Sequence, residues 1–386
     1  MRKLALLLSL PATFACTEAD QTTPDIEARL DAMVPALLKS EKAAGVGIAI
    51  IRDGELHWSG YYGEQAPGTP VGEATAFNTA SVAKTITAET LIALERQGLI
   101  DYDEPIADFV EHPELSDDTR YLGLTTQLLM SHRAGLLNWA YAYPDGRLAF
   151  DHDPGTRFSY SGAGVELAAR YAEAKTGKPL QTLADEYVFA PLGIKEVSLG
   201  DIPPWADERI AVPMDSEGSF RPIAELNPLL GDPNAERLGA ADDLIVTVPA
   251  YAQLITALTS GLGDDEARSA RQTILTSFEG DPVYDCPDLE DLKCPDAYGH
   301  SIGWQIFQYD DHTIVTHSGS DAGENALVYY SPDKKHGAVV FVNGANGWFL
   351  MTRIIEIIGD EPLLADYYRG LITTVMGRDM PALSAE

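Results

Sequence analysis

The stretch FNTASVAKTITA, residues 77–88, raises the central question of this sequence. It places Ser81 three positions before Lys84, at the start of a helix predicted over residues 82–97 and stopped by Gly98. Residues i and i+3 share one face of a helix, so the lysine amine can lie near the serine hydroxyl. Burial and the positive end of the helix dipole both favour a neutral lysine, which can accept a proton. The pair is a candidate nucleophile and base, and the alternative is an ordinary polar first turn.

Two other segments contain a serine in a pattern that resembles a catalytic motif. Ser331 and Lys334 repeat the same spacing, but they lie in a proline-containing turn between predicted strands, where a structural role is expected. GHSIG, residues 299–303, satisfies the G-x-S-x-G pattern of nucleophile-elbow hydrolases. That elbow needs a strand before the serine and a helix after it, whereas an acidic loop precedes Ser301 and a strand-like segment follows it. The context therefore favours the first motif over Ser301.

The composition is that of a globular protein with an unusual charge. The chain has 386 residues, 45% hydrophobic and 22% charged, and this length suits one large domain or two. Its 27 basic and 59 acidic residues give a formal net charge of −32. Such a chain repels nucleic acid and anionic membrane surfaces, so neither is an expected partner.

The first residues have the features of a secretory signal. A basic segment, Met1 to Lys3, precedes a short apolar run over residues 4–15, which is too short to span a bilayer. We therefore expect a signal peptide at residues 1–16 and a polar linker at residues 17–25.

The three cysteines bear on the same question. Cys16, with Ala15 before it, resembles a bacterial lipoprotein processing site at which the cysteine is lipidated; plain secretion, with Cys16 at or near the cleavage point, is the alternative. On the lipoprotein interpretation, Cys286 and Cys294 form a small disulfide in an oxidising compartment, and no thiol is left over. We expect a periplasmic or secreted protein, held at the outer membrane only if Cys16 carries lipid.

The hydrophobic periodicity changes twice along the chain. Strand patterns occur near the N-terminus and again near the C-terminus, whereas residues 100–295 contain mostly helical patterns broken by Pro- and Gly-rich loops. One antiparallel sheet that unites both ends would bury these strands, with the helical middle as a second lobe. A helix is expected to open near residue 26, strands at 45–51, 55–63, 303–309, 313–319, 326–331 and 337–343, and helices at 347–358 and 362–376.

The histidines do not form a metal-binding motif. All eight are scattered, with no H-E-x-x-H and no Cys-x-x-Cys, and no phosphate-binding or dinucleotide-binding glycine motif is present in a suitable context. We expect neither a metal nor an organic cofactor.

Several motifs in order give the chain a family resemblance. FNTASVAKTITA and the segments that follow it resemble the serine β-lactamase and penicillin-binding protein family, in particular the class C β-lactamase-related branch with its family VIII esterases, D-amino-acid peptidases and DD-carboxypeptidases. The further matching segments are TTQLLMSHRAGL (125–136), PGTRFSYSGAGVELAARYAEAKTG (154–177), FAPLGI (189–194), YGHSIGW (298–304) and HSGSDAG (317–323). The resemblance implies an α+β fold, an antiparallel sheet flanked by helices plus a mostly helical lobe.

The resemblance also implies a domain plan and a set of roles. Residues 26–376 would form one catalytic domain, with a sheet lobe of about 26–75 and 298–376, a helical lobe of about 82–295, and a tail at 377–386. Ser81 resembles the family's nucleophile, Lys84 its base or proton relay, and Tyr160 the tyrosine that shares proton transfer, for which Lys84 would supply the cationic neighbour that a phenolate needs. The backbone N–H groups of Ser81 and Ser320 would form the oxyanion hole. The substrate-binding residues implied are Gly162, His317, Ser318, Gly319 and Asn343.

Two departures from the family pattern bear on the substrate. Gly162 replaces the asparagine of the Tyr-Ser-Asn motif, and His317 replaces the lysine of Lys-Thr-Gly, so no permanent cation is offered to a substrate carboxylate. β-Lactams and D-Ala-D-Ala peptides carry that carboxylate, whereas simple esters do not. We expect a serine hydrolase of small esters, amides or peptides, most of all an esterase. The alternatives are β-lactamase, D-amino-acid peptidase or DD-carboxypeptidase activity, or a non-catalytic binding protein of the cell envelope.

Overall fold

The computed structural model of the protein describes residues 25–222, 225, 239–290 and 292–383. The predicted signal peptide, Cys16 and all but the last residue of the predicted linker lie outside these residues. No helix in the described ranges is long and apolar enough to cross a bilayer.

A nine-stranded antiparallel sheet unites the two ends of the chain, as the sequence predicts. In β1, Ile48 lies opposite Gly60 of β2 and Val340 of β12, so the N-terminal hairpin continues directly into the C-terminal strands. In order across the sheet the strands are β3 (Thr69–Pro70), β2 (Glu55–Ala66), β1 (Gly45–Arg52), β12 (His336–Val342), β11 (Glu324–Ser331), β10 (His312–Asp321), β9 (Gln305–Tyr309), β8 (Ala297–His300) and β7 (Thr276–Ser277).

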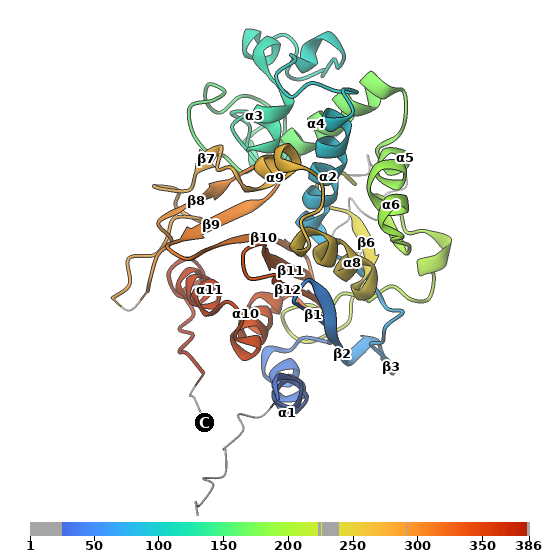
Figure 1. Ribbon diagram of the computed structural model, residues 1–386, viewed down its shortest axis with the longest axis vertical. Helices are drawn as coiled ribbons and strands as arrows, with labels where there is room; N and C mark the ends of the chain where they lie inside the picture. The colour runs from blue at the N-terminus through green and yellow to red at the C-terminus, as the bar shows by residue number, and fades with distance from the viewer. Residues whose placement is uncertain (1–24, 223–224, 226–238, 291, 384–386) are drawn as a thin grey trace, which may run out of the picture.

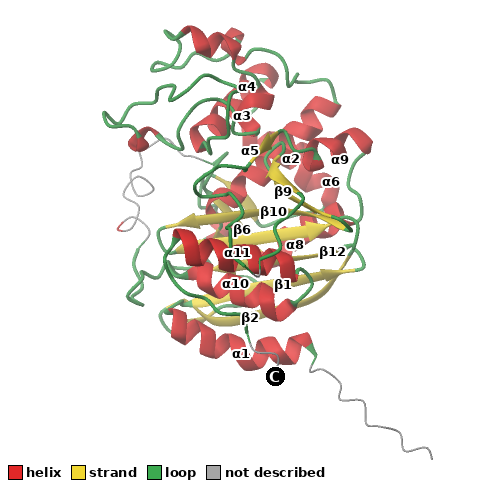
Figure 2. Cartoon of the chain, turned by 90° about the vertical axis from the view of Figure 1, so that its left-hand side faces the viewer, coloured by secondary structure: helices red, strands yellow, loops and turns green. Residues whose placement is uncertain are grey.

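Helices cover both faces of this sheet (Figures 1 and 2). On one face lie α1 (Ile26–Glu41), α10 (Gly347–Ile358) and α11 (Pro362–Val375), and on the other lies α8 (Val248–Thr259). Side chains alternate between the faces of a strand. Ile48 and Ile50 of β1 therefore belong to the hydrophobic core shared with α1, α10 and α11, and Ala49 and Ile51 to the core shared with α8. Burial on both faces explains why β1 is apolar from Gly45 to Ile51 instead of alternating with polar residues.

The helical lobe stands above the sheet in Figure 1 and is built around α2 (Ala83–Arg96), most of which is buried. A single 3₁₀ turn, η1 (Ala80–Val82), precedes this helix. Around it are α3 (Thr126–Met130), α4 (Gly162–Thr176), α5 (Leu180–Ala184), α6 (Ala190–Leu192), α9 (Asp265–Gln272), the 3₁₀ turns η2 (Ile106–Asp108), η3 (Thr119–Gly123), η4 (Ala140–Ala142) and η6 (Pro204–Ala206), and the π-helical turn η5 (Asp185–Phe189).

The middle of the chain differs from the expected run of helices in two respects. Two of its segments, β6 (Leu244–Thr247) and β5 (Val197–Leu199), form a second, three-stranded antiparallel sheet with β4 (Ala76–Asn78). In addition, α8 and β7 belong to the main sheet layer, although they fall within the range assigned to the helical lobe. Short apolar runs such as LIVT at 244–247 carry no periodicity that separates a strand from a helix.

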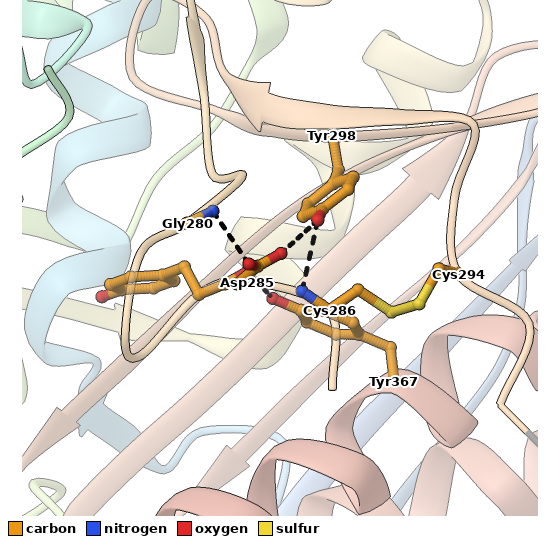
Figure 3. The surroundings of a disulfide bond; sticks show 7 residues. Gly280, Asp285, Cys286, Cys294, Tyr298 and Tyr367 are labelled. Atoms are coloured by element: carbon orange, nitrogen blue, oxygen red, sulfur yellow. Dashed lines mark hydrogen bonds between the residues drawn. A yellow bond between two sulfur atoms is a disulfide. The ribbon is translucent and has the colours of Figure 1, made fainter. Parts of the chain in front are cut away.

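A disulfide joins Cys286 and Cys294, which confirms the predicted pairing (Figure 3). The segment directly before Cys286 is anchored on two sides. The Tyr298 hydroxyl of β8 donates a hydrogen bond to Asp285, and the Tyr367 hydroxyl of α11 donates to the Tyr284 carbonyl at 2.8 Å. This segment therefore holds Tyr284 in a fixed place beside the terminal helices.

A buried ion pair connects α9 to the central helix α2. Arg271 of α9 contacts the Glu89 carboxylate of α2 through Nε and Nη2 at 2.7–2.9 Å. The Trp304 indole N–H, just before β9, donates to the same carboxylate at 3.0 Å. Only 5% of the Arg271 side chain and 2% of the Glu89 side chain are exposed, so the pair is sequestered from water.

Candidate active site

Ser81 lies in the turn that opens the central helix, as the sequence predicts. Ala80, directly before it, has a positive φ of 46°, which is uncommon for a residue with a side chain. The Asn78 side-chain oxygen accepts the Ala80 N–H at 3.2 Å and stabilises this turn. Strained backbone of this kind is found where a functional group must be held in a defined position.

Lys84 reaches the hydroxyl of Ser81, which confirms the expected proximity. Its Nζ lies 2.9 Å from Ser81 Oγ and 2.6 Å from the Ala241 carbonyl oxygen. Burial lowers the pKa of Lys84 to about 8, against the opposing effect of the nearby carboxylates of Asp242 and Glu166. The amine can therefore exchange a proton near neutral pH.

Tyr160 completes a contact group around the nucleophile. Its side chain interacts with Ser81, and Lys84 Nζ lies 4.9 Å from the centre of its ring. Burial raises the pKa of Tyr160, so the phenol keeps its proton. The expectation that Lys84 would favour a phenolate is not supported, because the amine lies over the ring face and desolvation dominates.

The central strand β10 runs against the nucleophile turn. A Cβ placed on Gly319 would lie 2.1 Å from the Thr79 carbonyl oxygen and 3.0 Å from the Ser81 backbone nitrogen, so only glycine fits here. This contact brings the expected substrate-binding segment of His317, Ser318 and Gly319 beside Ser81. Ser320 follows on the same strand, and the oxyanion role of its N–H stays a prediction.

His317 does not supply a cation. Its side chain is completely buried, and Nδ1 donates to the Ser318 carbonyl at 2.8 Å. Burial, with smaller effects from His300 and Lys84, lowers the pKa of His317 well below its ordinary value. The imidazole is neutral and therefore cannot pair with a substrate carboxylate at this position.

The comparisons with known proteins agree with this geometry. The sequence profile of the family described as Beta-lactamase matches residues 30–356. The chain belongs to this family. Esterase EstB of Burkholderia gladioli is 28% identical over 228 residues, which cover 51% of this chain and 57% of that protein. The unguisins hydrolase ungD of Aspergillus violaceofuscus is 25% identical and matches 84% of this chain.

Solved structures confirm the fold. The octameric penicillin-binding protein homologue of Pyrococcus abyssi has a TM-score of 0.68 and 19% identity, over 86% of this chain and 77% of that one. The match to ungD covers 62% of its length, so the chain spans less than two thirds of this relative and of EstB. Other relatives are named beta-lactamase, penicillin-binding protein and D-aminopeptidase, and the family supports a serine hydrolase.

Gly162, the departure from the family's asparagine, has a structural reason in this Beta-lactamase family member. A Cβ at this position would lie 2.3 Å from the indole ring of Trp139. Trp139 itself lies over Lys84, whose Nζ is 5.9 Å from the ring centre. The indole therefore occupies space that a larger side chain at position 162 would need.

Asn343 is not in a position to bind substrate through its side-chain amide group. The side chain is 1% exposed, and its Nδ2 donates to the carbonyl oxygens of Glu64 and Val212 at 3.1 and 3.0 Å. The residue ties the end of β12 to neighbouring backbone, which corrects the expectation. The sequence suggested a place in the cleft because Asn343 lies at the end of a predicted strand. Position in the sequence does not show what a side chain contacts.

Ser301 is likewise structural. It is completely buried after β8, and its hydroxyl donates to the Arg271 carbonyl at 2.7 Å. No helix follows it, so the alternative nucleophile elbow is absent from this place in the fold. Among the residues that the structure describes, no group of three or more His, Cys, Asp or Glu residues is arranged to hold a metal ion.

Two acidic residues at the site were missed in the sequence. The Asp242 carboxylate interacts with Lys84 and Ser81, and burial raises the pKa of Asp242 to about 7. Glu166 of α4 accepts the Ala241 N–H at 2.9 Å, and burial raises its pKa to about 8. The only signal in the sequence is a pair of acidic residues, Asp242 and Asp243, directly before the buried strand β6.

Proposed function

We propose that the protein is a serine esterase that forms an acyl-enzyme on Ser81. The observation that carries this proposal is the neutral, buried imidazole of His317 in the segment beside the nucleophile. A site that recognises a carboxylate needs a cation, whereas an ester without that charge needs none. One of the relatives, EstB, is named an esterase, and its similarity to this chain supports the proposal.

In the proposed reaction, Ser81 Oγ attacks the ester carbonyl and the alcohol leaves. Lys84 and Tyr160 move protons, since Lys84 contacts the Ser81 hydroxyl and Tyr160 lies beside Lys84 and interacts with Ser81. The N–H groups of Ser81 and Ser320 stabilise the oxyanion. Water then releases the acid and regenerates the hydroxyl.

An apolar cavity beside Ser318 supports substrates with a hydrophobic group. It has a volume of ≈ 170 Å³ and extends to Tyr284, whose ring stacks on Tyr160 at 5.9 Å between centres. Tyr284, just before the disulfide, and the terminal helices α10 and α11 contribute to its walls. Its apolar lining includes Val283, Trp348, Leu371, Ile372, Val375 and Met376. Such a lining favours burial of an aliphatic or aromatic substituent.

The test compares three substrate classes on purified protein. We expect p-nitrophenyl esters to give a burst of p-nitrophenol and steady turnover, with much slower hydrolysis of nitrocefin and of D-amino-acid amides. Ser81→Ala should abolish turnover and labelling by a fluorophosphonate probe while the thermal unfolding midpoint stays near that of the wild type.

Ser301→Ala is the matched control and should still be labelled. Labelling that survives Ser81→Ala would contradict the nucleophile assignment. Faster turnover of nitrocefin or an amide than of any ester would contradict the substrate class. Correctly folded protein without a burst on any of the three would indicate a binding protein instead of an enzyme.

We also propose that the protein is exported and that Cys16 carries lipid. The Cys286–Cys294 disulfide supports export, because such bonds persist in oxidising compartments. Labelled palmitate should be incorporated into the wild type in bacterial cells and not into Cys16→Ser. Export without label would leave plain secretion as the explanation.

A further inference from the structure

The turn over residues 239–243 supplies a hydrogen-bond acceptor for Lys84, although it belongs to no helix or strand. The Ala241 carbonyl in this turn accepts from Lys84 Nζ at 2.6 Å, a shorter distance than the 2.9 Å between Nζ and Ser81 Oγ. A turn has no ladder of backbone hydrogen bonds to fix it. The position of this carbonyl therefore depends on the contacts that other elements make with the turn.

Two threonines near the nucleophile hold the ends of the turn. Thr87 Oγ of α2 donates to the Ala240 carbonyl at 2.6 Å. At the other end, the Thr79 N–H donates to the Leu244 carbonyl at 3.0 Å. The turn is thus attached to the nucleophile helix and to the residues that precede it.

Glu166 of α4 holds the turn from the helical lobe. Its Oε1 accepts the Ala241 N–H at 2.9 Å. This N–H and the Ala240 carbonyl belong to the same planar trans peptide group, in which the two bonds point in opposite directions. One peptide plane is therefore held on one side by α2 and on the other by α4, and the Ala241 carbonyl follows directly after it.

Glu166 is the one charged residue between Gly162 and Ala169, and the other residues of this stretch are buried. A carboxyl in such surroundings costs free energy unless it is hydrogen-bonded. Its Oε1 can accept a hydrogen bond whether the carboxyl is neutral or ionised, so the contact does not depend on the protonation state. An apolar residue would serve the packing of α4 equally well. The contact with Ala241 is what accounts for an acid at this position.

The direction of the Lys84 amine follows from this arrangement. A neutral amine has two N–H groups and one lone pair, and the lone pair must face the Ser81 hydroxyl to take its proton. The bond to the Ala241 carbonyl engages one N–H and keeps the flexible lysine side chain from turning away. A displaced carbonyl would therefore leave the amine without a fixed orientation.

We propose that Glu166 is a positioning residue for acylation. It holds the peptide group before Ala241, so that the carbonyl of this residue keeps the Lys84 amine directed at Ser81. This inference rests on the proposed function, in which Ser81 is the nucleophile and Lys84 moves its proton. Glu166 acts through the backbone and needs no contact with the substrate.

The experiment measures the burst of p-nitrophenol from p-nitrophenyl acetate in Glu166→Leu and Glu166→Gln. Leucine is similar in size to glutamate but cannot accept a hydrogen bond, whereas the glutamine oxygen can. We expect Glu166→Leu to lower the acylation rate constant by about 10- to 10²-fold. The substrate concentration that half-saturates the burst rate should change by less than about threefold, because binding is not affected. Glu166→Gln should restore most of the rate.

Glu173→Leu is the matched control. Glu173 lies about two turns further along α4, and its Oε1 accepts the Leu180 N–H at 2.7 Å. The control variant loses the same kind of hydrogen bond from the same helix, away from Lys84. Its acylation rate should stay within about threefold of the wild type, and thermal unfolding of each variant reports on folding.

Thr87→Val keeps the test decisive if Glu166→Leu does not fold. It releases the same peptide group from the side of α2, so it should also slow acylation without changing half-saturation. An unchanged rate in a folded Thr87→Val would overturn the inference.

Three further outcomes would overturn it. They are a wild-type acylation rate in Glu166→Leu, a Glu166→Gln variant as slow as Glu166→Leu, and an equal loss in Glu173→Leu. All of these leave Ser81 as the nucleophile. A wild type that gives no Ser81-dependent acylation would instead overturn the proposed function and this inference with it.

Discussion

At the scale of single residues, Gly319 shows how closely the sheet and the nucleophile turn are fitted together. A methyl group at this position would lie 2.1 Å from the Thr79 carbonyl oxygen and 3.0 Å from the Ser81 nitrogen. Both atoms belong to the backbone, so neither can move without displacing the nucleophile turn.

We therefore predict that Gly319→Ala lowers kcat for esters by about 10²-fold or more, because it displaces an N–H group expected in the oxyanion hole. The variant should also lose about 1–3 kcal/mol of stability from overpacking. Steady-state kinetics and urea unfolding measure the two effects. Gly72→Ala is the control, since nothing lies within 4 Å of the added carbon. Equal activities in the two variants would contradict the close fit.

Residue-level prediction from the sequence succeeded where chemistry is local. Ser81 and Lys84 are three positions apart on one helix, so their contact follows from helical geometry. Asp242 lies more than 150 positions from Lys84, and no periodicity links the two segments. The role of Asn343 was also not predictable, because its side chain donates to backbone carbonyl groups that no sequence motif indicates.

At the scale of elements, the junction between α2 and α9 depends on the buried pair of Glu89 and Arg271. We predict that Arg271→Met costs about 3–5 kcal/mol, because it leaves the Glu89 carboxylate buried without its partner. Urea denaturation measures the loss. The double variant Glu89→Gln, Arg271→Met should recover much of it, since a neutral amide can still accept the Trp304 N–H. A single variant as stable as the wild type would rule out this role.

Strands and helices with strong periodicity were predicted well. The helix over 347–358 matches α10 in both bounds, and the strand expected at 45–51 is β1 with one further residue. The sheet of β4, β5 and β6 was missed because its strands have three or four residues each, and pairing with distant partners creates them.

At the scale of the whole molecule, the net charge of −32 acts on stability. Like charges in a compact protein repel one another, and salt screens them over about 10 Å at 0.1 M. We predict that the thermal unfolding midpoint rises as sodium chloride is raised from low to moderate concentration. A midpoint that falls would mean that screened ion pairs outweigh the net repulsion.

The architecture as a whole was predictable because strand patterns at both ends of the chain have one economical solution. A single sheet buries both sets, and β1 between β2 and β12 is that solution. The packing of α8 on the main sheet was not predictable, since an apolar helix can pack equally against a sheet or inside a helical lobe.

The position of β1 has a consequence for how the protein comes to be folded. This strand is made early, yet its second neighbour, β12, begins almost three hundred residues later in the chain. Its apolar edge therefore stays unpaired until almost three hundred further residues have been synthesised, and closing so long a loop slows folding. Until β12 arrives, the exposed edge is a place where chains can associate wrongly, so a chaperone during synthesis would be of most use to this strand.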